Sequence, residues 1–224
     1  MSTLLLLKLT LGPIMVLFAH FLQKKYGHGI GGRLIGLPIT TGPFILIVCL
    51  QEGRAFGAYV AHGVLLGQIA LSMYCWIYAM ASAKFNWWIS LSIGTATCLA
   101  TGYVTTQYKI STHATIILLA AVWIIAMKFW PPAASLPMKV SSPPWELPAR
   151  VLVTLTILFG LSTLAPHLGA SISGAFSTYP VIASVISAFN HRRYGPAATM
   201  ATLRGLMQTL PLTIVFIAVL AYTL

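Results

Sequence analysis

Long apolar segments separated by short polar turns dominate the pattern of hydrophobic and polar positions in this chain. A segment of about 20 mainly apolar residues is long enough to cross the hydrocarbon core of a membrane as a helix. We therefore predict an all-α polytopic membrane protein that forms one integral membrane domain over residues 1–224. The roughly eight predicted transmembrane helices cover approximately residues 4–22, 34–50, 56–83, 89–105, 113–129, 147–164, 170–189 and 197–222.

Two of these segments contain a proline-bearing motif within apolar sequence. The first is Gly-Leu-Pro-Ile-Thr-Thr-Gly-Pro over residues 36–43, and the second is Gly-Ala-Phe-Ser-Thr-Tyr-Pro over residues 174–180. Proline lacks an N–H group and clashes with the preceding helical turn, so both motifs predict broken membrane helices. The backbone groups that a break frees must face protein, water or a ligand. The motif residues predicted to bind substrate are Thr40, Thr41, Pro43, Ser177, Thr178 and Pro180.

The two motifs belong to a longer internal repeat. After the two prolines, Gly57 aligns with Gly195 and Gly67 aligns with Gly205. Because the two copies are displaced by five segments, an odd number, they must have opposite orientations. Inverted repeats of three helices with discontinuous helices are typical of secondary transporters, whereas chance recurrence of glycine and proline is the alternative. The first repeat, a two-helix insert, a linker and the second repeat are predicted at residues 1–83, 84–130, 131–146 and 147–224.

The composition agrees with a membrane protein and excludes a soluble domain. Hydrophobic residues make up 58% of the chain and charged residues only 7%. The net charge of +11 would favour nucleic acid in a soluble protein, but here we predict no nucleic-acid partner. Most basic residues fall in the turns after segments 1, 3, 5 and 7, and the positive-inside rule places that side in the cytoplasm. We therefore predict a multi-pass protein of the bacterial inner (plasma) membrane with both termini in the periplasm.

Further polar residues within apolar segments complete the predicted substrate site. Arg204 lies well inside the last segment, where its charge is costly unless a partner or a ligand offsets it. No carboxylate is expected to pair with it inside the membrane, because Glu52 and Glu146 both fall in predicted loops. An anionic ligand is therefore the favoured interpretation, and snorkelling of the side chain is the alternative. The other polar candidates for substrate binding are Gln68, Gln208 and His62.

These candidates have simpler interpretations as well. Gln68 and Gln208 could bond substrate or only a neighbouring helix. His62 could carry a coupling proton or remain a neutral, hydrogen-bonded side chain. The two breaks could be kinks that only help helices to pack.

The sequence offers no catalytic or metal-binding constellation. Its three cysteines lie in apolar segments without Cys-x-x-Cys spacing, and its histidines show no His-x-x-x-His pair. Neither a Ser/His/Asp set nor paired carboxylates occur. We therefore predict that the chain is not an enzyme and that it binds neither a metal ion nor a cofactor.

The motifs resemble those of known membrane proteins. Gly-Leu-Pro-x-Thr-x-Gly-Pro at residues 36–43, with Tyr-Pro-Val at 179–181 and Phe-x-His-Arg at 189–192, resembles uncharacterised bacterial inner-membrane proteins of about eight spans. About twenty residues of the seventh segment resemble the GlpM-like membrane proteins linked to alginate production. Neither family brings a settled activity, so the resemblance implies the fold and the location.

The favoured function is a secondary transporter or exporter of a small anionic or amphipathic metabolite. The substrate is expected near the bilayer midplane, between the broken helices. A non-transporting accessory membrane subunit of an envelope or polysaccharide assembly is the alternative, and a lipid-modifying enzyme is a third. The predicted partners are the anionic substrate and membrane lipids. A homodimer is a further possibility.

Overall fold

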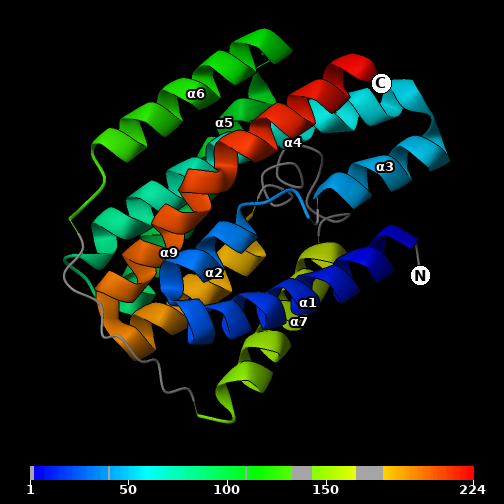
Figure 1. The fold of residues 1–224 in the computed structure, drawn as a ribbon. Coiled ribbons are helices and arrows are strands. Elements are labelled where there is room, and N and C mark those ends of the chain that lie inside the picture. Colours follow the sequence, from blue (N-terminus) through cyan, green and yellow to red (C-terminus); the bar gives the residue numbers. More distant parts are fainter. Residues whose placement is uncertain (1–2, 40, 109, 133–142, 165–178) are drawn as a thin grey trace.

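The computed structural model describes the chain except residues 1–2, 40, 109, 133–142 and 165–178, and the described part is all-helical (Figure 1). The helices are α1 (Thr3–Tyr26), α2 (His28–Ile35), α3 (Thr41–Glu52), α4 (Arg54–Ser82), α5 (Trp87–Gln107), α6 (Thr112–Lys128), α7 (Glu146–Leu164) and α9 (Val181–Thr223). Three of them, α4, α7 and α9, are long and apolar enough to cross a membrane. The predicted class of helical membrane protein is therefore supported, while the number of spans stays a prediction.

The glycine-rich stretch after α1, predicted as a link between helices, is the helix α2. Glycine is a poor helix former, so this helix depends on its neighbours. It packs between α1 and α9, and a Cβ atom added at Gly32 would overlap the carbonyl oxygen of Thr202. A Cβ atom at Gly205 of α9 would in turn overlap the carbonyl oxygen of Gly29. Small residues let helix backbones approach this closely, and the packing overrides the low propensity.

Three glycines with positive φ form sharp corners between helices. Gly27, Gly53 and Gly195 have φ angles of 91°, 90° and 82°. This region of backbone space is readily open only to glycine. Gly195 divides α9 into a first part, residues 181–194, and a second part, residues 196–223, so the predicted basic turn between segments 7 and 8 shrinks to a single residue.

The three corner glycines share one backbone conformation. The ψ angles of Gly27, Gly53 and Gly195 are 167°, 167° and −178°. Gly57, which the sequence pairs with Gly195, instead lies inside α4 and packs against Cys49. The pairing of Gly57 with Gly195, and the repeat itself, therefore stay predictions.

The turns collect at two ends of the helix bundle. At one end, which we call the Gly27 end, the His28 ring lies 5.0 Å from that of Tyr194, and the Arg192 guanidinium lies 5.7 Å from the Trp87 ring. Glu146, at the start of α7, also bonds Tyr194 there. The turns predicted to share one side of the membrane therefore lie together. Figure 1 shows both marked termini on the opposite, right-hand side of the view.

The core lies where α4 packs against α5, α6 and the second part of α9. Proline at position 211 of α9 cannot donate to the carbonyl of Met207, one turn earlier. The indole Nε1 of Trp123 in α6 donates to that carbonyl instead, at 2.6 Å. The tryptophan thus supplies the hydrogen-bond donor that the proline lacks, and it joins α6 to α9.

Candidate functional site

The first predicted break is present in the structure. Helix α2 ends at Ile35 and α3 begins at Thr41, so the helical ladder is interrupted at the motif. The hydroxyl of Thr209 donates to the Arg33 carbonyl at 2.8 Å, and the hydroxyl of Thr213 donates to the Gly36 carbonyl. Hydroxyls from the second part of α9 therefore satisfy carbonyls at the end of α2.

The other motif residues are placed only in part. Thr41 is the first residue of α3 and is partly buried, while Pro43 is exposed. Pro180 is the N-cap residue of α9 and is partly buried. Thr40, Ser177 and Thr178 lie outside the described residues, so the second predicted break stays a prediction.

Beside the first break, the structure brings a second arginine to the predicted Arg204 site. The Nε of Arg33 in α2 donates to Oε1 of Gln208 at 3.0 Å, and all three side chains are exposed. Arg204 lies one helical turn before Gln208, on the same side of α9. We call Arg33, Arg204 and Gln208 the arginine face. Within the described ranges the one ion pair is elsewhere, so this face carries two positive charges without a carboxylate.

Sequence reasoning missed Arg33, because it read this residue as a basic loop residue that sets topology. The usable signal was helical spacing from His28, since a helix at residues 28–35 would place Arg33 on a helix and not in a loop. That signal was hidden by four glycines in the stretch 27–32.

The remaining candidates lie in other parts of α4. The Nδ1 of His62 and the Thr112 hydroxyl are 3.1 Å apart, so this histidine joins α4 to α6. The Oε1 atom of Gln68 is buried and has no hydrogen-bond partner in the described structure. Both positions leave the substrate-binding interpretations untested.

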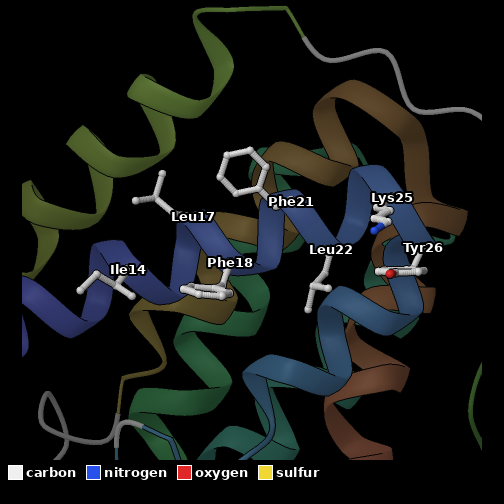
Figure 2. Close-up of a pocket in the computed structure, with 7 residues that line it drawn as sticks. All are labelled: Ile14, Leu17, Phe18, Phe21, Leu22, Lys25 and Tyr26. Carbon is white, nitrogen blue, oxygen red and sulfur yellow. The ribbon is translucent and has the colours of Figure 1, made fainter.

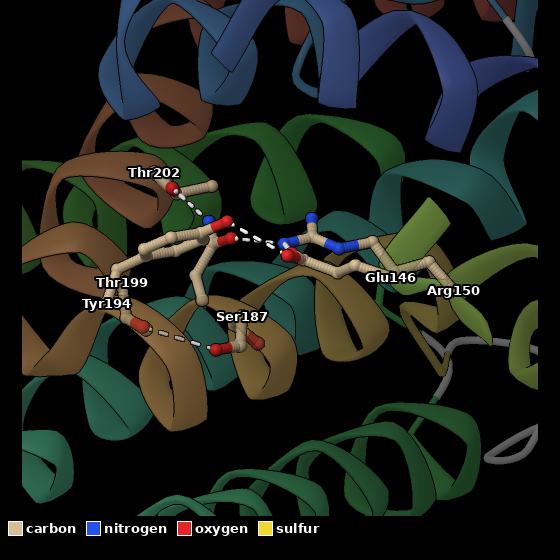
Figure 3. Close-up of polar contacts among 7 residues, drawn as sticks. Glu146, Arg150, Ser187, Tyr194, Thr199 and Thr202 are labelled. Carbon is tan, nitrogen blue, oxygen red and sulfur yellow. Dashed lines mark hydrogen bonds and ion pairs between the residues drawn. The ribbon is translucent and has the colours of Figure 1, made fainter. Parts of the chain in front are cut away.

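A second polar group, missed entirely by sequence reasoning, is buried at the Gly27 end. Glu146 was predicted in a loop, but it is the first residue of α7, only 1% exposed, and forms an ion pair with Arg150. The Tyr194 hydroxyl donates to Glu146 Oε2 at 2.9 Å, and Arg150 Nη2 donates to Asn190 Oδ1 at 2.8 Å. Asn190 Nδ2 then donates to the Thr202 hydroxyl at 2.9 Å. We call these five residues the Glu146 cluster (Figure 3).

The loop prediction for Glu146 failed for a local reason. Two prolines at 143–144 mark a loop, but the helix begins directly after them. An acidic residue in the first turn is favoured by the helix dipole and can pair with an arginine four residues later. Its burial depends on Tyr194, a partner that is 48 residues away in the sequence.

Several buried polar atoms around the Glu146 cluster lack hydrogen-bond partners in the described structure. They are Nε and Nη1 of Arg150, both ring nitrogens of His28, and Nε2 of Gln23. His28 lies outside the three candidate spans; burial, and secondarily the charge of Arg150, lowers its pKa from 6.5 to about 4. The imidazole is therefore neutral at neutral pH. Unpaired buried groups are costly, so this region suits water molecules or a small polar ligand.

An open apolar groove of about 670 Å³ runs along α1 (Figure 2). It is lined by Ile14, Leu17, Phe18, Phe21, Leu22, Lys25 and Tyr26. Its polar groups lie only at the end that carries Lys25 and Tyr26, where the ammonium is 5.1 Å from the ring centre. The groove is suited to apolar chains, not to a small anion.

Comparison with protein-family models, with curated proteins and with solved structures finds no match for this chain. The resemblances drawn from the two motifs therefore stay predictions. In the described part of the chain, no three His, Cys, Asp or Glu residues lie together as metal ligands.

Proposed function

We propose that this protein is a secondary membrane transporter for a small anionic metabolite. The substrate binds at the arginine face, beside the interruption between α2 and α3. The observation that carries this proposal is the hydrogen bond from Arg33 to Gln208 one turn from Arg204, which gathers two positive charges where the helix is broken.

The depth of the arginine face supports a ligand. Arg204 lies eight residues after Pro196, the first residue of the second part of α9, so it is about 12 Å along the helix at about 1.5 Å per residue. A hydrocarbon core is about 30 Å thick, so a span that enters the membrane at Pro196 would hold this side chain at membrane depth. Charged side chains at that depth are costly and usually face a cavity, a partner or a substrate path.

A side-chain amide at the arginine face also favours an anion. The amide of Gln208 accepts from Arg33 through its oxygen, which leaves its NH₂ group available to donate. Two arginines and an amide together match a carboxylate or phosphate group.

We include the inverted relation between residues 1–83 and 147–224 in this proposal. Its support is the shared corner conformation of Gly53 and Gly195, each followed by a long helix, α4 or the second part of α9. Transporters with inverted repeats move one repeat against the other around a fixed site. The bacterial inner membrane and periplasmic termini belong to the same proposal.

Uptake by vesicles that contain the purified protein tests the proposal. Radiolabelled acetate, succinate and inorganic phosphate serve as probes. We expect Arg204→Ala to lose uptake that the matched Arg54→Ala control retains, since Arg54 is an exposed arginine at the start of α4. Equal uptake by both variants would remove the arginine face from the mechanism. Failure of the wild-type protein to take up any probe, with stable co-purification of a larger partner, would favour the accessory-subunit function.

A further inference from the structure

The apolar groove along α1 lies on the face that this helix turns away from the rest of the protein. Phe18 and Phe21 in its walls are each 59% exposed, whereas Val16 and Ala19 on the other side of α1 are fully buried. Side chains four residues apart form ridges along a helix, with a groove between neighbouring ridges. The lining residues fall into two such rows, which are Ile14, Phe18, Leu22 and Tyr26, and Leu17, Phe21 and Lys25 (Figure 2).

The length of the groove matches one leaflet of a membrane. Tyr26 comes twelve residues after Ile14, so the groove is about 18 Å long at about 1.5 Å per residue. Half of a hydrocarbon core of about 30 Å is about 15 Å. Since α1 is a predicted span, an extended acyl chain in the groove would reach from the membrane surface to about the bilayer centre.

The polar end of the groove is positively charged. Lys24 and Lys25 lie in the last turn of α1 and are exposed, and neither forms an ion pair in the described part of the chain. The Lys25 ammonium is 5.1 Å from the centre of the Tyr26 ring. Lysine and tyrosine at the end of an apolar helix face lie at the level of lipid head groups. This end adjoins Gly27, on the predicted cytoplasmic side, where anionic lipids attract basic residues.

A second copy of the chain would fit this face less well than a lipid. Two copies related by a two-fold axis along the membrane normal would bring their Lys25 side chains to the same end of the interface. The chain has only two acidic residues to offset these charges. Glu146 is buried and paired with Arg150, and Glu52 ends α3, whose corner with α4 lies on the side of the termini (Figure 1). A lipid phosphate supplies the negative charge that a second copy lacks at this end.

We propose that the α1 groove binds one anionic phospholipid of the predicted cytoplasmic leaflet. One acyl chain lies along the groove between Ile14 and Leu22, and the phosphate of the head group pairs with Lys25. The inference does not rest on the proposed transport, because no residue of the arginine face lines the groove.

Native mass spectrometry of the detergent-purified protein tests the lipid site, because it resolves bound lipids and copies of the chain by mass. The probes are anionic phosphatidylglycerol and zwitterionic phosphatidylcholine with the same acyl chains. We expect wild type to retain one phosphatidylglycerol in preference to phosphatidylcholine, and Lys25→Gln to retain about fivefold less of it. The matched control is Lys84→Gln, an exposed lysine in the turn after α4, which should behave like wild type. Equal retention by wild type and both variants, or no preference for the anionic lipid, would overturn the proposal.

Two tryptophan variants test the acyl-chain part of the site in the same experiment. Leu22→Trp places a larger side chain in the groove, whereas Leu50→Trp does so on α3, where Leu50 is 86% exposed. We expect Leu22→Trp to retain less phosphatidylglycerol than wild type, and Leu50→Trp to retain as much. Equal retention by the two variants would place the lipid elsewhere. A wild-type dimer that Leu22→Trp dissociates would show that a second copy occupies the groove, and would also overturn the proposal.

Discussion

The arginine face and the Glu146 cluster handle charge in opposite ways. At the arginine face, the exposed side chains of Arg33 and Arg204 lie beside Gln208, and no carboxylate of the described structure forms an ion pair with either arginine. In the Glu146 cluster, a single arginine is buried, 1% exposed, and neutralised by an adjacent carboxylate. The exposed positive charges of the arginine face are accessible to a ligand, whereas the buried charges of the Glu146 cluster already compensate each other. The charges of the cluster therefore hold helices together, while the proposed anion binding depends on the arginine face.

The largest expected effect comes from breaking the buried pair. Glu146→Ala leaves Arg150 charged and unpaired, and such a change costs about 3–5 kcal/mol of the free energy of unfolding. The double variant Glu146→Ala/Arg150→Met should recover most of that loss, because it removes both charges. Denaturant titration of the purified protein measures both values. Equal destabilisation of the single and double variants would contradict the ion-pair account.

The second largest expected effect on stability comes from the glycine contact between α2 and α9. A methyl group at Gly32 would overlap the Thr202 carbonyl, so we expect Gly32→Ala to cost about 1–3 kcal/mol of the free energy of unfolding. Gly63→Ala is the matched control, because nothing lies within 4 Å of a Cβ atom there. The control should be neutral or slightly stabilising, since alanine is the better helix former. Similar stability of the two variants would show that α2 does not pack closely on α9.

The bond from Trp123 to Met207 should contribute less. Trp123→Phe removes one hydrogen-bond donor and should cost about 0.5–1.5 kcal/mol of the free energy of unfolding. Pro211→Ala supplies a backbone N–H to the same carbonyl, so the tryptophan change should cost less in that background. The four unfolding free energies form a double-mutant cycle. If the two changes in unfolding free energy simply add, Trp123 does not compensate for the N–H group that Pro211 lacks.

A different kind of effect, a pH dependence of stability, is expected from His28. Its folded-state pKa of about 4 lies below the ordinary value of 6.5, so the unfolded chain binds more protons between these values. The contribution of His28 to stability is full above pH 6.5 and is lost as the pH falls toward about 4. A His28→Phe variant should show a shallower fall of the unfolding free energy across this window. An unchanged slope would mean that His28 is not buried as a neutral ring.

The first helix break was predictable from local sequence, because glycine and proline act through backbone geometry. Residues 36–43 predicted an interruption, and α2 and α3 are separate helices there. The apolar pattern also predicted long helices, such as α4 and α7, within a residue or two of their observed ends. The second motif lies mostly outside the described residues and gives no further comparison.

Features that depend on distant partners could not be predicted in this way. Helix α2 exists because its glycines fit against α9, more than 160 residues later in the chain. The burial of Glu146 depends on Tyr194, and the position of Arg33 depends on Gln208. Composition and spacing describe one segment at a time, so they identified Arg204 and Gln208 but assigned Arg33 and Glu146 to loops.

The most direct test of the anion site is the thermal unfolding midpoint of the purified protein with and without anions. A ligand that binds only the folded state raises this midpoint by mass action. We predict that at least one of acetate, succinate and inorganic phosphate raises the midpoint of wild type and of Arg54→Gln, but not of Arg33→Gln/Arg204→Gln. An equal rise in all three proteins, at equal ionic strength, would place the anion elsewhere and contradict the role of the arginine face.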